Sequence, residues 1–283
     1  MKVSFFPGCS LEGTAREYGE SIEAVCSSLD IQLNELSDWN CCGASSAHAT
    51  NEFLSIALPA RNLAIAEKAE YDLVTPCAAC FSRFKTAEKE LTGTSPVDVG
   101  VPFKGEINVL HILDFICGEE FSEGIEKKVI KPLNNLKTVS YYGCLLVRPP
   151  RTTDARQWED PMDLDTLVSQ LGGESVYWPY KTECCGGSLV LSKVDIVRRL
   201  CGRLFDMALE AGAECIVTAC PLCQANLDTR QEETGNQKGI TYDIPVFYFT
   251  ELMGLAFGNK EADKWFSRHI IDPRPLLQRK ELL

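Results

Sequence analysis

Ten of the fourteen cysteines fall into two copies of one pattern, a lone cysteine followed by Cys-Cys-Gly and then by Cys-x-x-Cys. In both copies 34 residues separate the adjacent pair from the Cys-x-x-Cys. Thiolates are strong ligands for transition metals. The repeated spacing therefore predicts two related metal sites. The first would be built from Cys9, Cys41, Cys42, Cys77 and Cys80, and the second from Cys144, Cys184, Cys185, Cys220 and Cys223.

Five cysteines per copy favour an iron–sulfur cluster over zinc. Four thiolates suffice for structural zinc or for a cubane cluster. Adjacent residues point their side chains apart, so the Cys-Cys pair favours a larger, more open cluster. Zinc in each half, or redox-active dithiols of the thioredoxin kind, remain as alternatives. The other four cysteines lie in apolar segments and are predicted to be small core residues: Cys26, Cys117, Cys201 and Cys215.

A few charged or titratable side chains lie near the cysteines in the sequence. His48, six residues beyond the first Cys-Cys pair, is a weak candidate for a catalytic proton donor. Lys181 and Arg148 lie close to second-copy cysteines and could attract an anionic substrate, although solvated surface charges are the commoner case. His111, in an apolar run, is predicted to be a core or interface residue. His269, in the C-terminal tail, is predicted to lie on the surface.

Short apolar runs alternate with helical patterns along the whole chain. This alternation predicts an α/β fold with a small, mostly parallel sheet and flanking helices in each half. Strands are predicted over 2–7, 31–36, 71–75, 138–143, 175–177 and 215–219, and helices over 17–29, 51–71, 78–91, 164–171 and 191–211. The apolar segments 107–117 and 245–253 match each other, and 107–117 is predicted to open a helix. A charged linker over 118–137 divides the chain into predicted domains 1–130 and 131–283.

The cysteines lie at the ends of the predicted strands. Sites in parallel sheets form outside the carboxyl ends of the strands. The lone cysteine, the adjacent pair and the Cys-x-x-Cys each follow a strand-like run, so five cysteines are expected to converge on one rim. The gap between lone cysteine and pair is 31 residues in the first copy and 39 in the second. The surplus falls in the polar stretch 148–161, where an inserted loop is tolerated.

Composition limits the partners and the location. The net charge of −12 and the pI of about 4.9 argue against nucleic acid and anionic membrane surfaces as partners. The longest apolar stretches have strand length, so no membrane span is expected. The apolar N-terminal run is too short for a signal peptide, which favours a cytoplasmic protein. No Gly-x-Gly-x-x-Gly or Walker loop is present, so electrons for redox chemistry would come from a partner.

Both copies of the pattern closely resemble the cysteine-rich CCG domain. Two such domains in a chain of this size resemble the catalytic B subunit of heterodisulfide reductase. The resemblance implies two duplicated domains related by a pseudo-twofold axis, each holding a noncubane [4Fe-4S] cluster on its five cysteines. A disulfide would be reduced to two thiols between the clusters, or thiols oxidised in reverse. The implied partners are a ferredoxin-type protein like HdrC and a flavoprotein like HdrA.

CCG domains also occur in electron-transfer subunits of other dehydrogenase complexes, of the lactate or glycolate oxidation type and the succinate:quinone reductase type. In the lactate-type relatives one motif is typically degenerate, whereas both copies are complete here. A membrane-associated quinone reductase subunit is expected to carry an amphipathic helix with a basic face. The best candidate, 260–279, is mixed in charge and contains Pro273 and Pro275, so it fits poorly.

Overall fold

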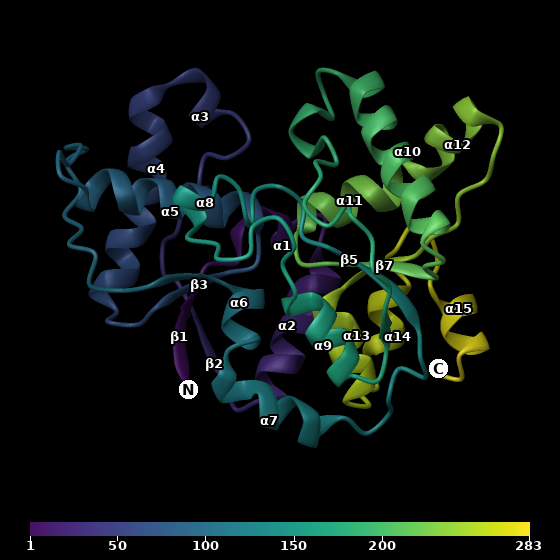
Figure 1. Ribbon diagram of the computed structural model, residues 1–283. Coiled ribbons are helices and arrows are strands. Elements are labelled where there is room, and N and C mark those ends of the chain that lie inside the picture. The colour runs from purple at the N-terminus through teal and green to yellow at the C-terminus, as the bar shows by residue number, and fades with distance from the viewer.

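The computed structural model describes residues 1–283 as two four-stranded parallel sheets with helices around them (Figure 1). The first sheet has the order β2-β1-β3-β4 and the second has the matching order β6-β5-β7-β8. All strand pairs in both sheets are parallel. The predicted α/β fold with a duplicated parallel sheet is confirmed.

The first half contains four short strands and seven helices. Its elements are β1 (Lys2–Phe5), α1 (Gly8–Glu12), α2 (Arg16–Ser28), β2 (Gln32–Glu35), α3 (Ala47–Thr50), α4 (Glu52–Lys68), β3 (Leu73–Thr75), α5 (Ala78–Thr92), β4 (Val109–His111), α6 (Ile112–Ile116) and α7 (Glu119–Lys128). The segment 107–117, expected to open a helix, first forms the edge strand β4. Its β-branched and aliphatic residues pair with β3 before the helix begins, because the neighbouring strand can complete their hydrogen bonds.

The second half repeats this order with an insertion and a C-terminal extension. Its elements are β5 (Lys137–Tyr141), α8 (Pro150–Thr153), α9 (Asp163–Gln170), β6 (Glu174–Ser175), the 3₁₀ turn η1 (Gly187–Leu189), α10 (Val194–Glu210), β7 (Cys215–Thr218), α11 (Pro221–Thr229), α12 (Gln231–Lys238), β8 (Val246–Tyr248), α13 (Phe249–Ala256), α14 (Ala262–Phe266) and α15 (Arg274–Arg279). The predicted domain boundary near residue 130 falls between α7 and β5 and stays a prediction.

The larger of two hydrophobic clusters spans both halves, and the smaller one lies within the second half. Helix α2 of the first half packs mainly against α13 and α14 of the second, in the lower centre of Figure 1. Tyr18 stacks on Tyr248 with ring centroids 4.0 Å apart, and the Ser21 and Thr250 hydroxyl oxygens lie 2.7 Å apart beside them. A buried aromatic stack adds specificity to the apolar burial. The packing fixes how the carboxyl ends of the two sheets face each other. No helix is both long and apolar enough to cross a bilayer.

Candidate metal centre

Each Cys-x-x-Cys lies where a strand gives way to a helix. Cys77 follows β3 and is the N-cap of α5, and Cys80 lies in the first turn of that helix. Cys220 follows β7 and is the N-cap of α11, with Cys223 in its first turn. Amide groups at a helix start lack intrahelical acceptors and carry a partial positive charge, so they can stabilise negatively charged sulfur at both turns.

In the second adjacent pair the side chains diverge, as expected, because Cys184 contacts Cys144 and Cys185 contacts Cys223. In the first pair the Cys41 and Cys42 thiols remain in hydrogen-bond contact with each other, against the expectation. The Gly43 N–H donates to Cys41 Sγ at 3.4 Å, and the corresponding Gly186 N–H donates to Cys184 Sγ at 3.2 Å. The second cysteine of each pair turns inward toward the last cysteine of its own half. The Cys42–Cys80 Sγ distance is 3.0 Å and the Cys185–Cys223 distance is 3.8 Å. One cysteine of each pair is therefore exposed and the other is buried.

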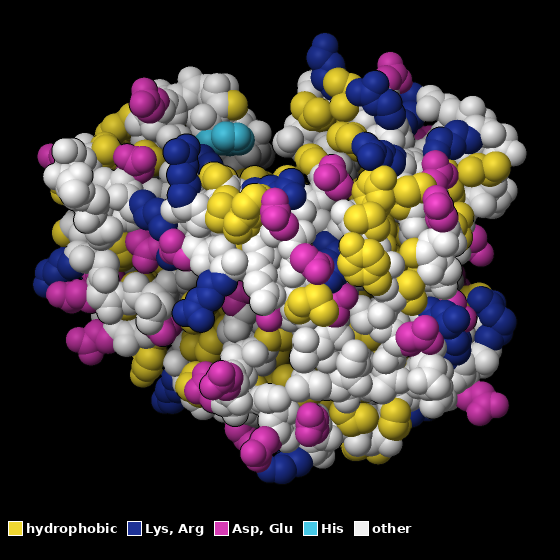
Figure 2. Space-filling model, in the orientation of Figure 1, with side chains coloured by type: hydrophobic (Ala, Val, Ile, Leu, Met, Phe, Trp, Pro, Cys, Tyr) yellow, Lys and Arg dark blue, Asp and Glu magenta, His cyan; other side chains and the backbone are white.

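All ten cysteines line a single cavity of about 490 Å³ between the halves. In Figure 2 a hollow opens between the lobe of α3 and α4 and the lobe of α10, with hydrophobic side chains at its border. The cysteines nearest solvent are Cys9, Cys41 and Cys184, and the buried ones are Cys42, Cys77, Cys80, Cys185 and Cys220. The five-residue sets predicted from spacing thus converge, and they face one common space.

A glycine before each lone cysteine makes room for sulfur. Gly8 has φ +71°, and a Cβ there would lie 3.4 Å from Cys80 Sγ. Gly143 has φ +67°, and a Cβ there would lie only 2.9 Å from Cys223 Sγ. A residue with a side chain at either position would have to adopt the unfavourable left-handed backbone conformation. Its Cβ would also crowd a cysteine sulfur. Both halves therefore keep the chain close to the sulfurs, as a bulky sulfur-ligated group requires.

Neighbouring thiols favour an anionic sulfur in each half. Hydrogen bonds from Cys41 and then Cys80 lower the pKa of Cys42 to about 3. A hydrogen bond from Cys144 lowers the pKa of Cys184 to about 6. Hydrogen-bonded donors stabilise the charged form of a thiol even where burial opposes it. Cys42 and Cys184 thus favour the thiolate, which is the form of cysteine that binds metal.

The two Cys-x-x-Cys turns meet at the interface between the halves. Cys77 and Cys220, the first cysteines of the two turns, interact with each other there, and this contact is the main cause that raises the pKa of Cys77. The carbonyl preceding each turn is held by a buried side chain. His111 Nε2 lies 3.1 Å from the Pro76 oxygen, and the Tyr18 hydroxyl donates to the Ala219 oxygen at 3.0 Å.

His111 is a buried interface residue, as predicted. Its Nδ1 accepts from the Leu113 N–H at 3.2 Å, which leaves Nε2 as the nitrogen that donates to Pro76. Burial lowers the pKa of His111 to about 4, so the ring is neutral. The role of Tyr18 was not predicted, because its place on the apolar face of a helix indicated only a core residue.

The charged residues suggested by the sequence do not line the cavity, whose lining contains no charged side chain. His48 is on α3, outside the lining, and its catalytic role stays a prediction. Arg148 donates to the Thr182 hydroxyl at 2.8 Å. Lys181 is buried, not solvated, and pairs with Asp160 at 2.7 Å and Asp165 at 3.1 Å. Lys181 lies close to Cys184 in the sequence, but its side chain turns away from the cavity toward the inserted segment.

The prediction that His269 lies on the surface is wrong. The C-terminal helices fold back over α13, so the side chain is buried and lies 2.9 Å from Glu251 Oε1. The four cysteines outside the pattern are absent from the cavity lining, as predicted. Cys26, Cys201 and Cys215 are buried and Cys117 is partly buried.

A duplicated parallel α/β unit with five cysteines at the carboxyl ends of each sheet defines the class of this protein. The family model of the cysteine-rich domain named CCG matches residues 3–85 and 138–228. The chain belongs to this family.

Relatives from bacteria and archaea match nearly the whole chain. The chain is 31% identical to the 8-methylmenaquinol:fumarate reductase membrane anchor subunit of Wolinella succinogenes, covering 97% of this chain and 99% of that protein. It is 29% identical to the B subunit of the ferredoxin:CoB-CoM heterodisulfide reductase of Methanosarcina mazei, covering 91% of this chain and 89% of that protein.

A solved structure shares the fold. The crystal structure of a hypothetical protein from Helicobacter pylori matches 96% of this chain with a TM-score of 0.71 at 9% identity. The chain spans about half of that structure, at 52% of its length. At this identity the likeness concerns the fold alone.

Proposed function

We propose that the chain is an iron–sulfur redox subunit of a heterodisulfide reductase-like complex. Each half would hold one noncubane [4Fe-4S] cluster on its five cysteines, and the clusters would supply and accept single electrons. The observation that carries the proposal is the convergence of two five-cysteine sets on one cavity of about 490 Å³. Relatives named as B subunits of heterodisulfide reductases support it.

The arrangement of the cysteines favours a cluster over zinc. Each half contributes five cysteines to the lining of the cavity, one more than a zinc ion binds. A zinc site needs four ligands about 2.0–2.3 Å from one ion. Cysteines spread around a shared cavity suit a group with several metal ions, because different sulfurs then bind different irons.

The proposed reaction is the reduction of a disulfide to two thiols, with two electrons and two protons consumed, or its reverse. The sulfur–sulfur bond breaks and one sulfur–hydrogen bond forms on each product. The lining of the cavity contains no Lys, Arg, Asp or Glu, and it offers hydroxyl groups that can donate hydrogen bonds to sulfur. These come from Ser10, Ser45, Ser188 and Ser192.

Electrons for this reaction would come from partner subunits. The chain contains no nucleotide-binding loop, and all of its proposed redox groups lie in one cavity. A ferredoxin-type protein and, behind it, a flavoprotein are the partners that this proposal requires.

A second candidate function is electron transfer in a quinol-linked reductase. It is favoured by the uncharged lining of the cavity, where aliphatic side chains border the entrance. Such a lining suits a neutral, apolar reactant such as a quinone. The relative named as part of 8-methylmenaquinol:fumarate reductase supports this alternative.

Anaerobic purification with metal and sulfide analysis tests the cluster proposal. Iron with equimolar acid-labile sulfide is expected, and thiol addition under oxidising conditions is expected to produce paramagnetic signals. Zinc without sulfide would refute the proposal. The rate at which reduced viologen is oxidised is then measured with a disulfide as the electron acceptor and, separately, with a water-soluble menaquinone analogue as the acceptor. Turnover with the disulfide supports the first function, and turnover with the quinone alone supports the second.

A further inference from the structure

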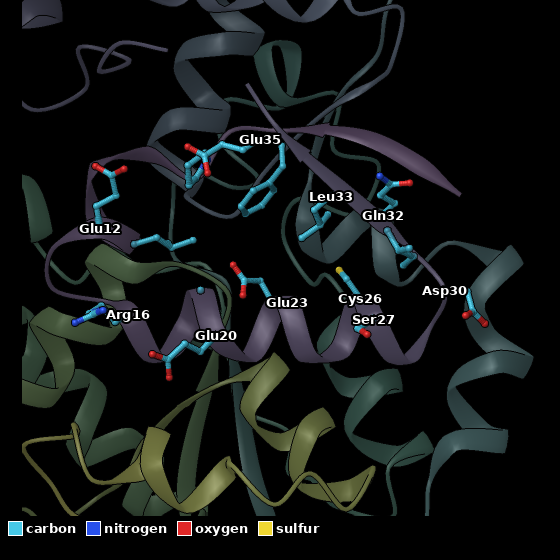
Figure 3. A pocket seen from close by; sticks show the side chains of 15 residues that line it. Glu12, Arg16, Glu20, Glu23, Cys26, Ser27, Asp30, Gln32, Leu33 and Glu35 are labelled. Carbon is cyan, nitrogen blue, oxygen red and sulfur yellow. The ribbon is translucent and has the colours of Figure 1, made fainter. Parts of the chain in front are cut away.

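A second and larger cavity, a groove of about 700 Å³, lies in the first half between α2 and the strands β1 and β2 (Figure 3). Its floor is apolar and includes the buried side chains of Phe5, Leu11 and Ile31. Its rim carries one guanidinium, Arg16, and five carboxylates. These carboxylates are Glu12, Glu20, Glu23, Asp30 and Glu35.

The groove is open because of how its two walls pack. Helix α2 packs mainly against α13 and α14 of the second half, so its opposite side faces the groove. The other wall includes β2, the outermost strand of the sheet, whose far edge has no neighbouring strand. Exposed strand edges are recurrent docking sites for extended segments of other chains.

The rim carries five carboxylates and one guanidinium, and three of the carboxylates are unpaired. Glu20 is paired with Arg268 at 2.7 Å, and Glu35 accepts a hydrogen bond from Trp39. Glu12, Glu23 and Asp30 take part in none of the ion pairs of the structure. Figure 3 shows Glu23 on α2 and Asp30 at the far end of the groove. A cationic segment would therefore gain attraction at the rim without displacing existing partners.

The groove and the cysteine cavity share one short helix. In α1, Cys9 and Ser10 face the cysteine cavity, whereas Leu11 and Glu12 face the groove. A helix with its side chains is about 10 Å across. A protein seated in the groove would therefore lie about one helix width from the first five-cysteine set.

We propose that this groove docks a basic, extended segment of the redox partner subunit. The partner's cationic side chains pair with the carboxylate rim, and its apolar side chains contact the floor. A second copy of this chain is the wrong occupant, because its net charge is −12. That the partner exchanges electrons rests on the proposed function. The docking itself rests on the groove.

A charge-neutralising triple variant tests the docking. Glu12→Gln, Glu23→Gln and Asp30→Asn remove the unpaired rim charges of the groove. The probe is a fluorescein-labelled peptide of alternating lysine and valine, added to the anaerobically purified full chain. Roughly tenfold weaker binding is expected from three partly solvated charge pairs. The wild-type affinity is expected to fall as salt rises, and a peptide of alternating glutamate and valine is expected not to bind.

A matched triple variant controls for net charge. Glu90→Gln, Glu210→Gln and Glu232→Gln change three exposed carboxylates outside the groove. This variant is expected to bind the peptide as the wild type does. Equal weakening in both triple variants would overturn the proposal, because attraction would then follow net charge alone.

Cross-linking locates the partner itself. The complex, isolated through a tag on this chain, is treated with a carbodiimide that joins carboxylates to lysines. Links from Glu12, Glu23 or Glu35 to another subunit are expected. Intersubunit links confined to other carboxylates would refute the docking site. Viologen-driven turnover is expected to be equal in the wild type and the groove variant, and its absence from the wild type would refute the proposed function while leaving the docking result intact.

Discussion

The two halves of the molecule agree where they face the cysteine cavity and differ elsewhere. Strand order, cysteine positions and the left-handed glycine before the lone cysteine are the same in both. Outside the cavity, the edge strand has four residues in the first half and two in the second. The halves therefore agree in the strand order, cysteines and glycines that position the five sulfurs, and differ in the length of the edge strand.

The walls of the cavity also differ between the halves. Ser10 of the first half corresponds to Leu145, and Ala79 corresponds to Leu222. Leu191, which also lines the second wall, is 97% exposed. One wall is thus small and the other is aliphatic, so the two halves can bind chemically different parts of a reactant while presenting equivalent sulfurs.

Replacing equivalent cysteines tests whether the halves hold equivalent clusters. Cys41→Ser and Cys184→Ser are each expected to remove about half of the iron, because each cluster loses one thiolate ligand. Iron and sulfide content and the paramagnetic signals of the two variants measure this loss. The two variants are expected to keep different signals, one from each half.

Core cysteines serve as the controls for these variants. Cys26→Ser and Cys201→Ser introduce a hydroxyl at buried positions outside the cavity. Both are expected to lower the free energy of unfolding by about 1–3 kcal/mol and to retain all the iron. Iron loss in Cys26→Ser as large as in Cys41→Ser would contradict the division between ligands and core residues.

The equivalent glycines are expected to differ in tolerance. Gly143→Ala should lower the free energy of unfolding by about 3–4 kcal/mol. The alanine would be strained in the left-handed backbone conformation, and its Cβ would lie too close to the Cys223 sulfur. Gly8→Ala should cost about 1–2 kcal/mol, mainly from φ, because its Cβ would lie at 3.4 Å from sulfur. Chemical denaturation with iron release as a second readout measures both, and a larger effect at Gly8 would reverse the comparison.

Spacing predicted the cysteine sets because ligand positions in parallel sheets follow strand ends. Each Cys-x-x-Cys follows a strand end closely, whereas the Cys-Cys pairs follow β2 and β6 after a loop. All of these segments lie beyond the carboxyl ends of parallel strands, so they share one rim. The strand β4 was missed because a three-residue strand, Val-Leu-His, that runs directly into a helix carries no period of its own.

Side-chain pairs formed between elements that are distant along the chain could not be predicted from local patterns. Lys181 was read from its neighbours in sequence, but its partners Asp160 and Asp165 are brought to it by an inserted segment and by α9. His269 looked exposed because the tail is polar, yet its partner lies 18 residues earlier on α13. Such pairs depend on how elements pack, which no periodicity records.

Each half buries one histidine, and the pKa values of the two histidines are shifted in opposite directions. Burial lowers the pKa of His111 to about 4. Burial also opposes the charge of His269, but Glu251, with Asp228 and Glu17, raises its pKa to about 9. The pKa of His269 is thus higher in the folded than in the unfolded state. The resulting stabilisation is complete below about pH 6.5 and is lost as pH rises through about 9.

Thermal unfolding of the wild type and His269→Gln between pH 6.5 and 9.5 tests this. The difference in stability is expected to be on the order of 3 kcal/mol at the lower pH and to shrink as pH rises. His111→Gln is the control, and its difference from the wild type should vary by less than about 0.5 kcal/mol over this range, because His111 is neutral when folded. A gap for His269→Gln that stays constant with pH would show that His269 is not protonated in the folded protein.

Leu222→Ala and Leu145→Ser give the second-half wall of the cysteine cavity the small side chains of the first-half wall. Of the predicted effects, theirs is expected to be the smallest. Each leucine is about 40% exposed, so a reactant covering it would gain on the order of 1 kcal/mol. The KM for an aliphatic reactant is therefore expected to rise about fivefold, with kcat and iron content unchanged. Ala79→Leu and Ser10→Leu change the opposite wall. If all four variants alter KM alike, the walls do not distinguish the two ends of the reactant.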